Sequence, residues 1–351
     1  MELKSLIKKI EKNNKKLEKD AQNKIDLKTK PIGSLGVLES IAVKITMIQN
    51  SLNPVIKNKS LFVFAGDHGV AEDGISAFPP EVTPQMVLNF LNDGAAINVL
   101  CKHNNIDLKV IDMGVNFDFE KNENLINKKV KKGTKNFTKF QAMTEEEAIQ
   151  ALQNGIDVFD KINKKKKIDI IGLGDMGIGN TTSSSAIISC ITDIDPEKCT
   201  GRGTGIGDVK FQNKVNIIKK AILFHKPKKD DAIDILQKIG GFEIGGIAGA
   251  ILAASYYKIP VVIDGIISTA GALLAFLLNP NVSDYIFAGH KSIEIGQKAA
   301  LNFMNLEPIL DLKMRLGEGT GASLAINIID AACKIMIEMA SFEEAGVSNK
   351  E

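Results

Sequence analysis

One glutamate stands between glycines near the C-terminal end of the chain, in the segment Arg315–Ser323 (RLGEGTGAS). No side-chain bulk surrounds Glu318, so its carboxylate can meet a ligand directly, and neighbouring backbone N–H groups can approach the same ligand. A fixed, partly desolvated carboxylate aimed at one proton is what a general base requires. An isolated GEG is also typical of a tight turn with a solvated glutamate. A role for Glu318 as general base is therefore favoured only if other loops of this kind lie close to it in the fold.

A second glycine-rich loop spans Gly172–Ser183 (GLGDMGIGNTTS). Its backbone N–H groups, its hydroxyls and the start of the following helix predict a cradle for the dianion of a phosphate monoester. The same hydroxyls could instead cap a helix and bind no ligand. Residues 172–177 also match G-x-G-x-x-G after a strand, so an NAD-dependent dehydrogenase is the rival hypothesis. Asp193 and Asp195 have the spacing of its ribose-binding acid, but they stand in a segment that reads as a loop.

Three further groups could take part in binding. The segment Gly201–Gly207 (GRGTGIG), followed by Lys210 and Lys214, is a second candidate anion site, although alternating glycines are also typical of mobile loops. Asp67, His68, Glu72 and Asp73 lie close in sequence, but their spacing fits no standard metal site, and we predict no metal. His290 stands at the end of an apolar run, as a structural hydrogen-bonding group or a substrate contact.

Short apolar runs that end in polar or glycine-rich loops alternate with helical segments along the chain. The expected strands are Leu61–Ala65, Leu108–Met113, Ile168–Leu173, Val261–Asp264, Tyr285–Ala288 and Pro308–Lys313. Thr83, with Pro84 at the first helical position, predicts one helix start, and the capping box at Thr144 predicts another helix that extends to about Asn163. This alternation indicates an α/β fold: a parallel, Rossmann-like sheet with helices on both faces.

In such a sheet the loops that follow the strands lie at one edge, and ligands bind there. The loops that bear Asp67, Asp175, Asp264, His290 and Glu318 should therefore converge, although they are far apart in sequence. Residues 1–52 follow a helical period and predict a separate helical part.

Composition narrows the classes of protein. A net charge of +2 gives no reason to expect nucleic acid as a partner. The stretches Ile244–Ala254 and Ile266–Leu278 are too short or too rich in glycine to span a bilayer, and the lysine-rich N-terminus does not resemble a signal peptide. Four scattered cysteines favour a reducing compartment. We expect a cytoplasmic protein.

Together these segments closely resemble the nicotinate-nucleotide–dimethylbenzimidazole phosphoribosyltransferase family of cobalamin biosynthesis. The resemblance extends from Lys30 to the helix after Ser323. The motifs that carry it are Lys30–Glu39, Phe64–Val70, Glu81–Val87, Gly94–Asn98, Gly177–Thr182, Gly201–Gly205, Asp264-Gly265, Ala288–Lys291 and Arg315–Ala322.

The resemblance implies a role for each site residue. Glu318 is the expected catalytic base. Gln85, Lys214 and Leu316 are expected to bind the aromatic base. The nucleotide and its phosphate are assigned to Asp175, Gly177, Gly179, Asn180, Thr181, Gly203, Thr204, Asp264 and His290. One position departs from the family pattern, because Asp175 stands where members often carry glutamate.

The implied reaction moves the phosphoribosyl group of nicotinate mononucleotide to 5,6-dimethylbenzimidazole or a related base, and gives α-ribazole 5′-phosphate and nicotinate. No cofactor is expected, and the implied assembly is a homodimer. The implied domains are residues 1–52 as the N-terminal part of a small helical domain, 53–325 as the α/β large domain with the active site, and 326–351 as the C-terminal helix and tail of the small domain. Two alternatives stay open: the dehydrogenase, and a non-catalytic nucleotide sensor.

Overall fold

The chain forms an open sheet of seven parallel strands in the order β3-β2-β1-β4-β5-β6-β7. The computed structural model describes residues 1–203 and 205–348. The strands are β1 (Lys59–Gly66), β2 (Ile106–Gly114), β3 (Leu125–Asn127), β4 (Ile170–Met176), β5 (Val261–Ile263), β6 (Ile286–His290) and β7 (Pro308–Leu310). The chain winds outward in opposite directions from β1 and β4, so these neighbours form the switch point at which ligands of open α/β sheets bind.

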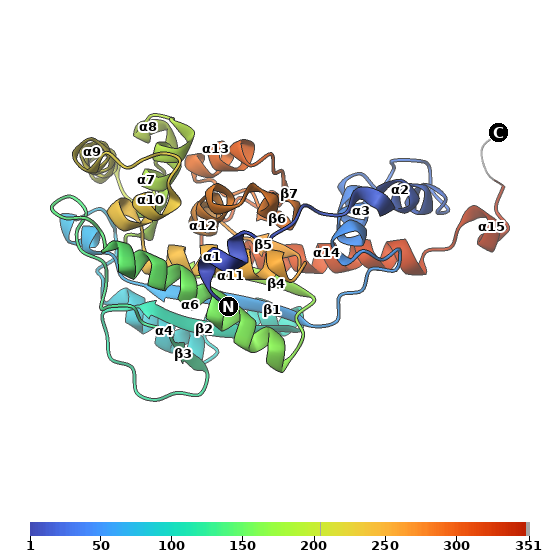
Figure 1. Ribbon diagram of the computed structural model, residues 1–351, viewed down its shortest axis with the longest axis horizontal. Coiled ribbons are helices and arrows are strands. Elements are labelled where there is room, and N and C mark those ends of the chain that lie inside the picture. Colours follow the sequence, from blue (N-terminus) through green and yellow to red (C-terminus); the bar gives the residue numbers. More distant parts are fainter. Residues whose placement is uncertain (204, 349–351) are drawn as a thin grey trace.

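Helices cover both faces of the sheet (Figure 1), which confirms the predicted α/β class. One face is covered by α6 (Glu145–Lys165), α11 (Phe242–Tyr256) and α12 (Ile266–Leu278). The other face is covered by α4 (Val82–Leu91), α5 (Ala96–His103) and α14 (Thr320–Glu338). The outer helices beyond α11 and α12 are α1 (Leu3–Ile7), α7 (Asn180–Thr192), α8 (Pro196–Cys199), α9 (Asp208–His225), α10 (Ala232–Ile239) and α13 (Ile295–Phe303).

Helices α6 and α11 pack with their backbones almost in contact. A Cβ atom at Gly155 would lie 2.0 Å from the carbonyl oxygen of Gly246, and one at Gly249 would lie 2.0 Å from that of Leu152. Only glycine permits this approach. The approach brings α11 flat onto the sheet, where 14 of its residues are buried.

Of the two predicted helix starts, one is confirmed and the other is wrong. Thr144 does form a capping box with Glu147 and begins α6. The prediction that Thr83 caps a helix is wrong: α4 begins at Val82, and the Thr83 hydroxyl accepts a hydrogen bond from Ile178 N at 3.1 Å. Strand β3 was not predicted, because three half-exposed or exposed residues carry no clear apolar signal.

The two ends of the chain meet beyond the sheet. Helix α3 (Val37–Gln49) packs against α2 (Glu18–Asp26) and α14, and Lys28 forms an antiparallel bridge with Ser341 just before α15 (Phe342–Ala345). Figure 1 shows α2, α3 and α15 grouped at one end of the molecule. The short 3-10 helices are η1 (Lys15–Leu17), η2 (Gly69–Asp73) and η3 (Pro280–Asp284). The division into domains at residues 52 and 325 stays a prediction.

Within the described residues, α14 alone is long and apolar enough to cross a membrane by length and composition. However, 61% of that window is buried in the structure, where α14 contacts β4, β5, β6 and β7. A core helix passes the same test of length and composition. The two apolar stretches of the sequence that were considered as membrane spans form α11 and α12, which are shorter than α14.

Candidate active site

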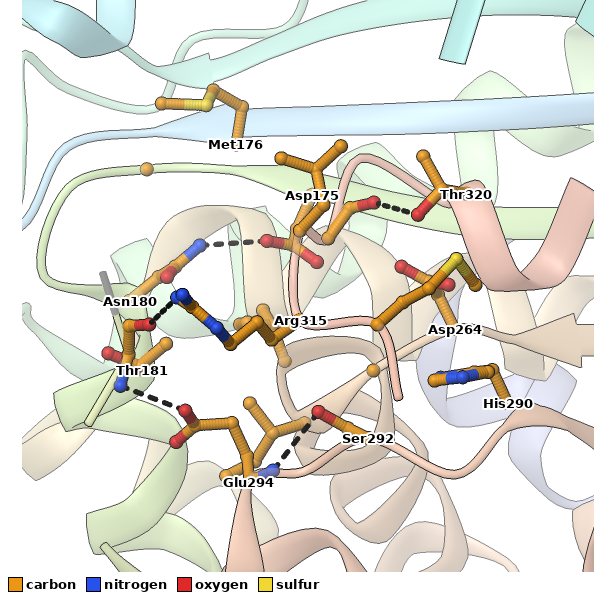
Figure 2. Close-up of a pocket in the computed structure, with 18 of the residues that line it drawn as sticks. Asp175, Met176, Asn180, Thr181, Asp264, His290, Ser292, Glu294, Arg315 and Thr320 are labelled. Carbon is orange, nitrogen blue, oxygen red and sulfur yellow. Dashed lines mark hydrogen bonds between the residues drawn. The ribbon is translucent and has the colours of Figure 1, made fainter. Parts of the chain in front are cut away.

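A pocket of about 240 Å³ opens where β4, β5 and β6 end and α14 begins (Figure 2). Eight of the predicted site residues line it: Asp175, Gly177, Asn180, Thr181, Gly203, Asp264, His290 and Leu316. In Figure 2, Asn180, Thr181 and Glu294 lie on one side, Asp264 and His290 on the other, and Arg315 between them. A larger hollow along β2 and β3 is lined by none of the predicted residues.

Four other predicted residues do not line this pocket. Glu318 is buried beside it, and Lys214 is buried behind Thr181. Gly179 faces away, toward the Cβ atom of His68. Gln85 is exposed on α4. Thr204 lies outside the described residues.

The loop that bears Asp67 belongs to the same end of the sheet, but its carboxylate does not reach the pocket. Its Oδ2 accepts a hydrogen bond from Asn116 N at 2.8 Å, which ties the end of β1 to the segment after β2. The loop of Asp67 therefore lies at the predicted edge of the sheet, but the Asp67 side chain does not line the pocket.

The backbone around Glu318 is unusual. Glu318 has a φ of 62°, between Gly317 at 83° and Gly319 at 90°. A left-handed conformation is uncommon outside glycine and recurs at functional sites. Gly174 supports it from β4, because a Cβ atom at residue 174 would lie 2.3 Å from the carbonyl oxygen of Glu318.

The Glu318 carboxylate is held in a nearly dry environment. Its Oε2 accepts a hydrogen bond from Ile97 N at 3.3 Å, in the first turn of α5. Burial raises the pKa of Glu318, while the Ile97 N–H group opposes the shift. A carboxylate whose pKa is raised in this way is a stronger base than a solvated one, and is suited to proton abstraction near neutral pH.

Asp264, at the end of β5, anchors the loop of Glu318. Its Oδ2 accepts from Gly319 N at 3.1 Å, and its Oδ1 accepts from Gly321 N at 2.6 Å and Ala322 N at 3.1 Å. These donors belong to the first turn of α14, where the helix dipole favours a negative charge. Burial nevertheless raises the pKa of Asp264 to about 7. Although Asp264 lines the pocket, its carboxylate is engaged with the protein, and we assign it a positioning role.

Asp175 ends β4 and faces the same space. Its Oδ2 accepts from Asn180 Nδ2 at 2.9 Å, and its Oδ1 is buried without a hydrogen-bond partner among the described residues. Burial, reinforced by the charges of Asp264 and Glu243, raises the pKa of Asp175 well above its usual range. The raised pKa favours the protonated carboxyl group, which can donate a hydrogen bond.

The start of α7 and the segment after Thr200 form a site suited to an anion. Lys214 Nζ donates to Thr181 Oγ1 at 2.8 Å and to Gly201 O at 3.4 Å. Burial lowers the pKa of Lys214 to about 8. Arg315 lines the same space and donates to Gly203 O at 3.5 Å. Lys214, which the resemblance assigned to the aromatic base, thus stands with the residues assigned to phosphate.

The tautomer of His290 follows from its contacts. Its Nε2 lies 3.0 Å from Leu312 N and must accept that hydrogen bond, so the proton is on Nδ1. Burial lowers the pKa of His290, which keeps the ring neutral. The loop is fixed by buried Gln297, whose Nε2 donates to His290 O at 3.0 Å and to Asp264 O at 3.2 Å.

Several residues that line the pocket were not predicted from the sequence. Phe78 and Met176 add apolar side chains to the lining, and Ser292 and Glu294 add polar groups. Phe78 lies in an irregular segment with no periodic signal, and Glu294 looks like any acid at a helix start. In the described part of the chain, no group of three or more His, Cys, Asp or Glu side chains is arranged to hold a metal ion.

A pocket of anion-binding loops and a buried carboxylate at the switch point of a parallel sheet is the arrangement of an α/β group-transfer enzyme. The sequence model of a phosphoribosyltransferase family matches residues 10–347, and the chain belongs to this family.

Curated relatives agree with this family. A nicotinate-nucleotide–dimethylbenzimidazole phosphoribosyltransferase of Citrifermentans bemidjiense is 50% identical over 99% of each chain, and one of Geotalea uraniireducens is 53% identical over 94% of each. The crystal structure of CobT from Thermus thermophilus matches with a TM-score of 0.92 and 39% identity, over 95% of this chain and 99% of that one. A second crystal structure, of the phosphoribosyltransferase of this name from the same organism, matches with a TM-score of 0.90 and 38% identity over the same shares.

The dehydrogenase alternative finds no support in these relatives or in the structure. Gly172 and Gly174 lie inside β4 and not in the turn after it, and Gly174 is needed for contact with Glu318. Asp193 ends α7 and Asp195 caps α8, so neither stands at the end of the next strand. The G-x-G-x-x-G match is therefore a coincidence of spacing.

Proposed function

We propose that the chain transfers the phosphoribosyl group of nicotinate mononucleotide to 5,6-dimethylbenzimidazole or a related base, and that Glu318 is the general base. The observation that carries this proposal is the buried Glu318 carboxylate, fixed by Ile97 and Gly174 next to the pocket. Two enzymes of that name are 50% and 53% identical to the chain over 99% and 94% of its length, which supports the choice of substrates.

The chemistry follows from the charges of the reactants. One benzimidazole nitrogen attacks C1′ of the ribose, and the bond from C1′ to the cationic pyridinium nitrogen breaks. The electron pair leaves with nicotinate, whose ring becomes neutral and needs little acid assistance. Attack opposite the leaving group converts the β-linkage into an α-linkage. The second benzimidazole nitrogen becomes acidic as charge develops, and Glu318 accepts its proton.

The two sides of the pocket suit the two substrates. Phe78, Met176 and Leu316 offer apolar surface for a flat heterocycle, near the Glu318 loop. Thr181, Gly203 and Lys214 offer a hydroxyl, a backbone N–H group and a positive charge for the phosphate. Placement of two rings on opposite faces of the ribose gains rate through orientation, and the phosphate contacts supply remote binding energy for it.

The phosphate assignment predicts that Thr181→Ala raises the KM for nicotinate mononucleotide. Loss of one hydrogen bond to a charged group costs roughly 1.5 kcal/mol, or about tenfold in affinity, and turnover should change less. Steady-state kinetics measures both. Thr192→Ala, at the other end of α7, is the matched control and should leave KM unchanged. An unchanged KM in T181A would place the phosphate elsewhere.

The lysine contact predicts a pH dependence of nucleotide binding. Lys214 must be protonated to attract a dianion, and burial lowers its pKa to about 8. We therefore expect the KM for the nucleotide to rise as the pH increases above about 8. Lys214→Met should raise the KM by about 10–100-fold at pH 7 and abolish this dependence. Lys220→Met, on the exposed face of α9, controls for loss of charge.

The direct test of function is incubation of the purified chain with nicotinate mononucleotide and a panel of benzimidazole, imidazole-type and purine-type bases, with products identified by mass. Release of nicotinate only when a base is present supports transfer. Binding of the nucleotide without any product would instead identify a sensor.

We also propose a homodimer in the cytoplasm, which acts on small molecules and binds neither nucleic acid nor membrane. The family likeness and the net charge of +2 support this proposal. Light scattering of the purified chain tests the assembly, and a mass near 76 kDa, about twice the 38.0 kDa of the chain, is expected.

A further inference from the structure

Glu294 places a carboxylate among the groups assigned to the phosphate. It stands just before α13 but does not cap that helix with its side chain. Instead, its Oε1 accepts a hydrogen bond from Gly203 N at 2.8 Å. In Figure 2 a dashed line leads from the Glu294 carboxylate toward the side of the pocket where Thr181 lies. The carboxylate thus uses one of the N–H groups that the phosphate would need.

The second oxygen of Glu294 accepts no hydrogen bond from the described residues. Glu294 is 5% exposed, and its Oε2 is buried without a hydrogen-bond partner among the described residues. Gly201 packs directly against it, because a Cβ atom at residue 201 would lie 1.7 Å from this oxygen. A buried charged oxygen without a partner is costly, so this arrangement is poised to change when a better ligand for the same groups arrives.

The charge of Glu294 and the volume of the pocket also indicate that this arrangement changes when the substrate binds. Glu294 is the acid whose negative charge raises the pKa of buried Lys214, against the larger effect of burial. A phosphate dianion next to an unmoved carboxylate would suffer like-charge repulsion. The pocket of about 240 Å³ is also below the roughly 300–1,000 Å³ of typical ligand sites, although it must take a nucleotide and a heterocycle together.

We propose that Glu294 is an internal competitor of the substrate phosphate: its carboxylate accepts the hydrogen bond from Gly203 N, and the nucleotide phosphate must displace it. This inference rests on the proposed phosphoribosyl transfer. A tethered carboxylate has a high effective concentration, so a weak monoanion does not displace it, whereas a dianion with three acceptor oxygens does. Glu294 thereby sets the specificity of the site for phosphate monoesters over other anions.

Calorimetric titration of the purified chain tests this competition. The two ligands are nicotinate mononucleotide and nicotinate riboside, which lacks the phosphate. Glu294→Gln keeps the shape and an acceptor for Gly203 but removes the charge. We expect its Kd for the nucleotide to fall at least about fivefold, and its Kd for the riboside to stay within about twofold of wild type. Glu307→Gln, an exposed acid before β7 that does not line the pocket, is the matched control and should change neither.

The outcomes separate this inference from the proposed function. If wild type binds the nucleotide and forms product, but E294Q binds the nucleotide equally or more weakly, Glu294 is a direct contact or a bystander and the competition is overturned. If wild type neither binds the nucleotide nor forms product with any base, the proposed function itself fails. Should E294Q not fold, Glu294→Asp, which draws the charge back from Gly203, is expected to tighten nucleotide binding as well; weaker binding in E294D overturns the proposal.

Discussion

Glu318→Gln is expected to lower turnover by about 10²–10⁴-fold while the Kd for nicotinate mononucleotide stays close to wild type. This range is the usual contribution of a positioned general base. Glutamine preserves the hydrogen bond from Ile97 N and the size of the side chain, but it cannot accept a proton from the heterocycle. Turnover measured at saturating substrates, together with calorimetry for the nucleotide, separates chemistry from binding.

The pH profile adds a second check on Glu318. A base must be ionised to act, so turnover falls as the pH decreases through its pKa, which burial raises. The acidic limb of the wild-type profile should therefore lie above the ordinary range of a glutamate and should be absent in E318Q. Glu338→Gln, at the exposed far end of α14, is the control and should keep both the limb and the rate. Turnover of E318Q within threefold of wild type would remove Glu318 from the mechanism.

The sequence was most informative where backbone geometry demands glycine. The glycines around Glu318 follow from three consecutive left-handed residues, and that signal is local. The parallel sheet was predictable because short apolar runs alternate with helical segments along the chain. Since all strands of a parallel sheet end at the same edge, this fold alone places Asp175, Asp264 and His290 there. These are consequences of short-range pattern and of fold geometry.

Side-chain contacts between segments far apart in the sequence were not predictable in the same way. Nothing near Lys214 in the sequence indicates that it reaches Thr181, because the approach depends on how α9 packs on α7. Thr83 fits the rules for a helix cap, but α4 begins one residue earlier. Its hydroxyl instead accepts a hydrogen bond from Ile178 N in the loop after β4. Glu294 carries the same ambiguity: only the position of Gly203 shows that its side chain turns away from its own helix.

Asp264→Asn is expected to destabilise the protein and to lower turnover, because Asp264 holds the loop that carries Glu318. The carboxylate accepts hydrogen bonds from Gly319, Gly321 and Ala322 through both oxygens, whereas asparagine offers one oxygen and turns an NH₂ group toward the remaining donor. A buried backbone N–H group left without an acceptor costs about 1–3 kcal/mol in the free energy of unfolding. Chemical denaturation at pH 8, above the raised pKa of Asp264, measures this loss.

The same substitution should lower turnover by about 10–100-fold, because misplacement of a catalytic group by about 1 Å has an effect of this size. The KM for the nucleotide should change much less, since Thr181, which accepts a hydrogen bond from Lys214, lies on the other side of the pocket (Figure 2). Asp311→Asn, at an exposed acid paired with Lys291 and Lys313, is the matched control, and it should leave the free energy of unfolding nearly unchanged. A D264N variant with normal turnover would show that the α14 loop holds Glu318 in place without Asp264. A raised KM at normal turnover would instead return Asp264 to the residues that bind the nucleotide.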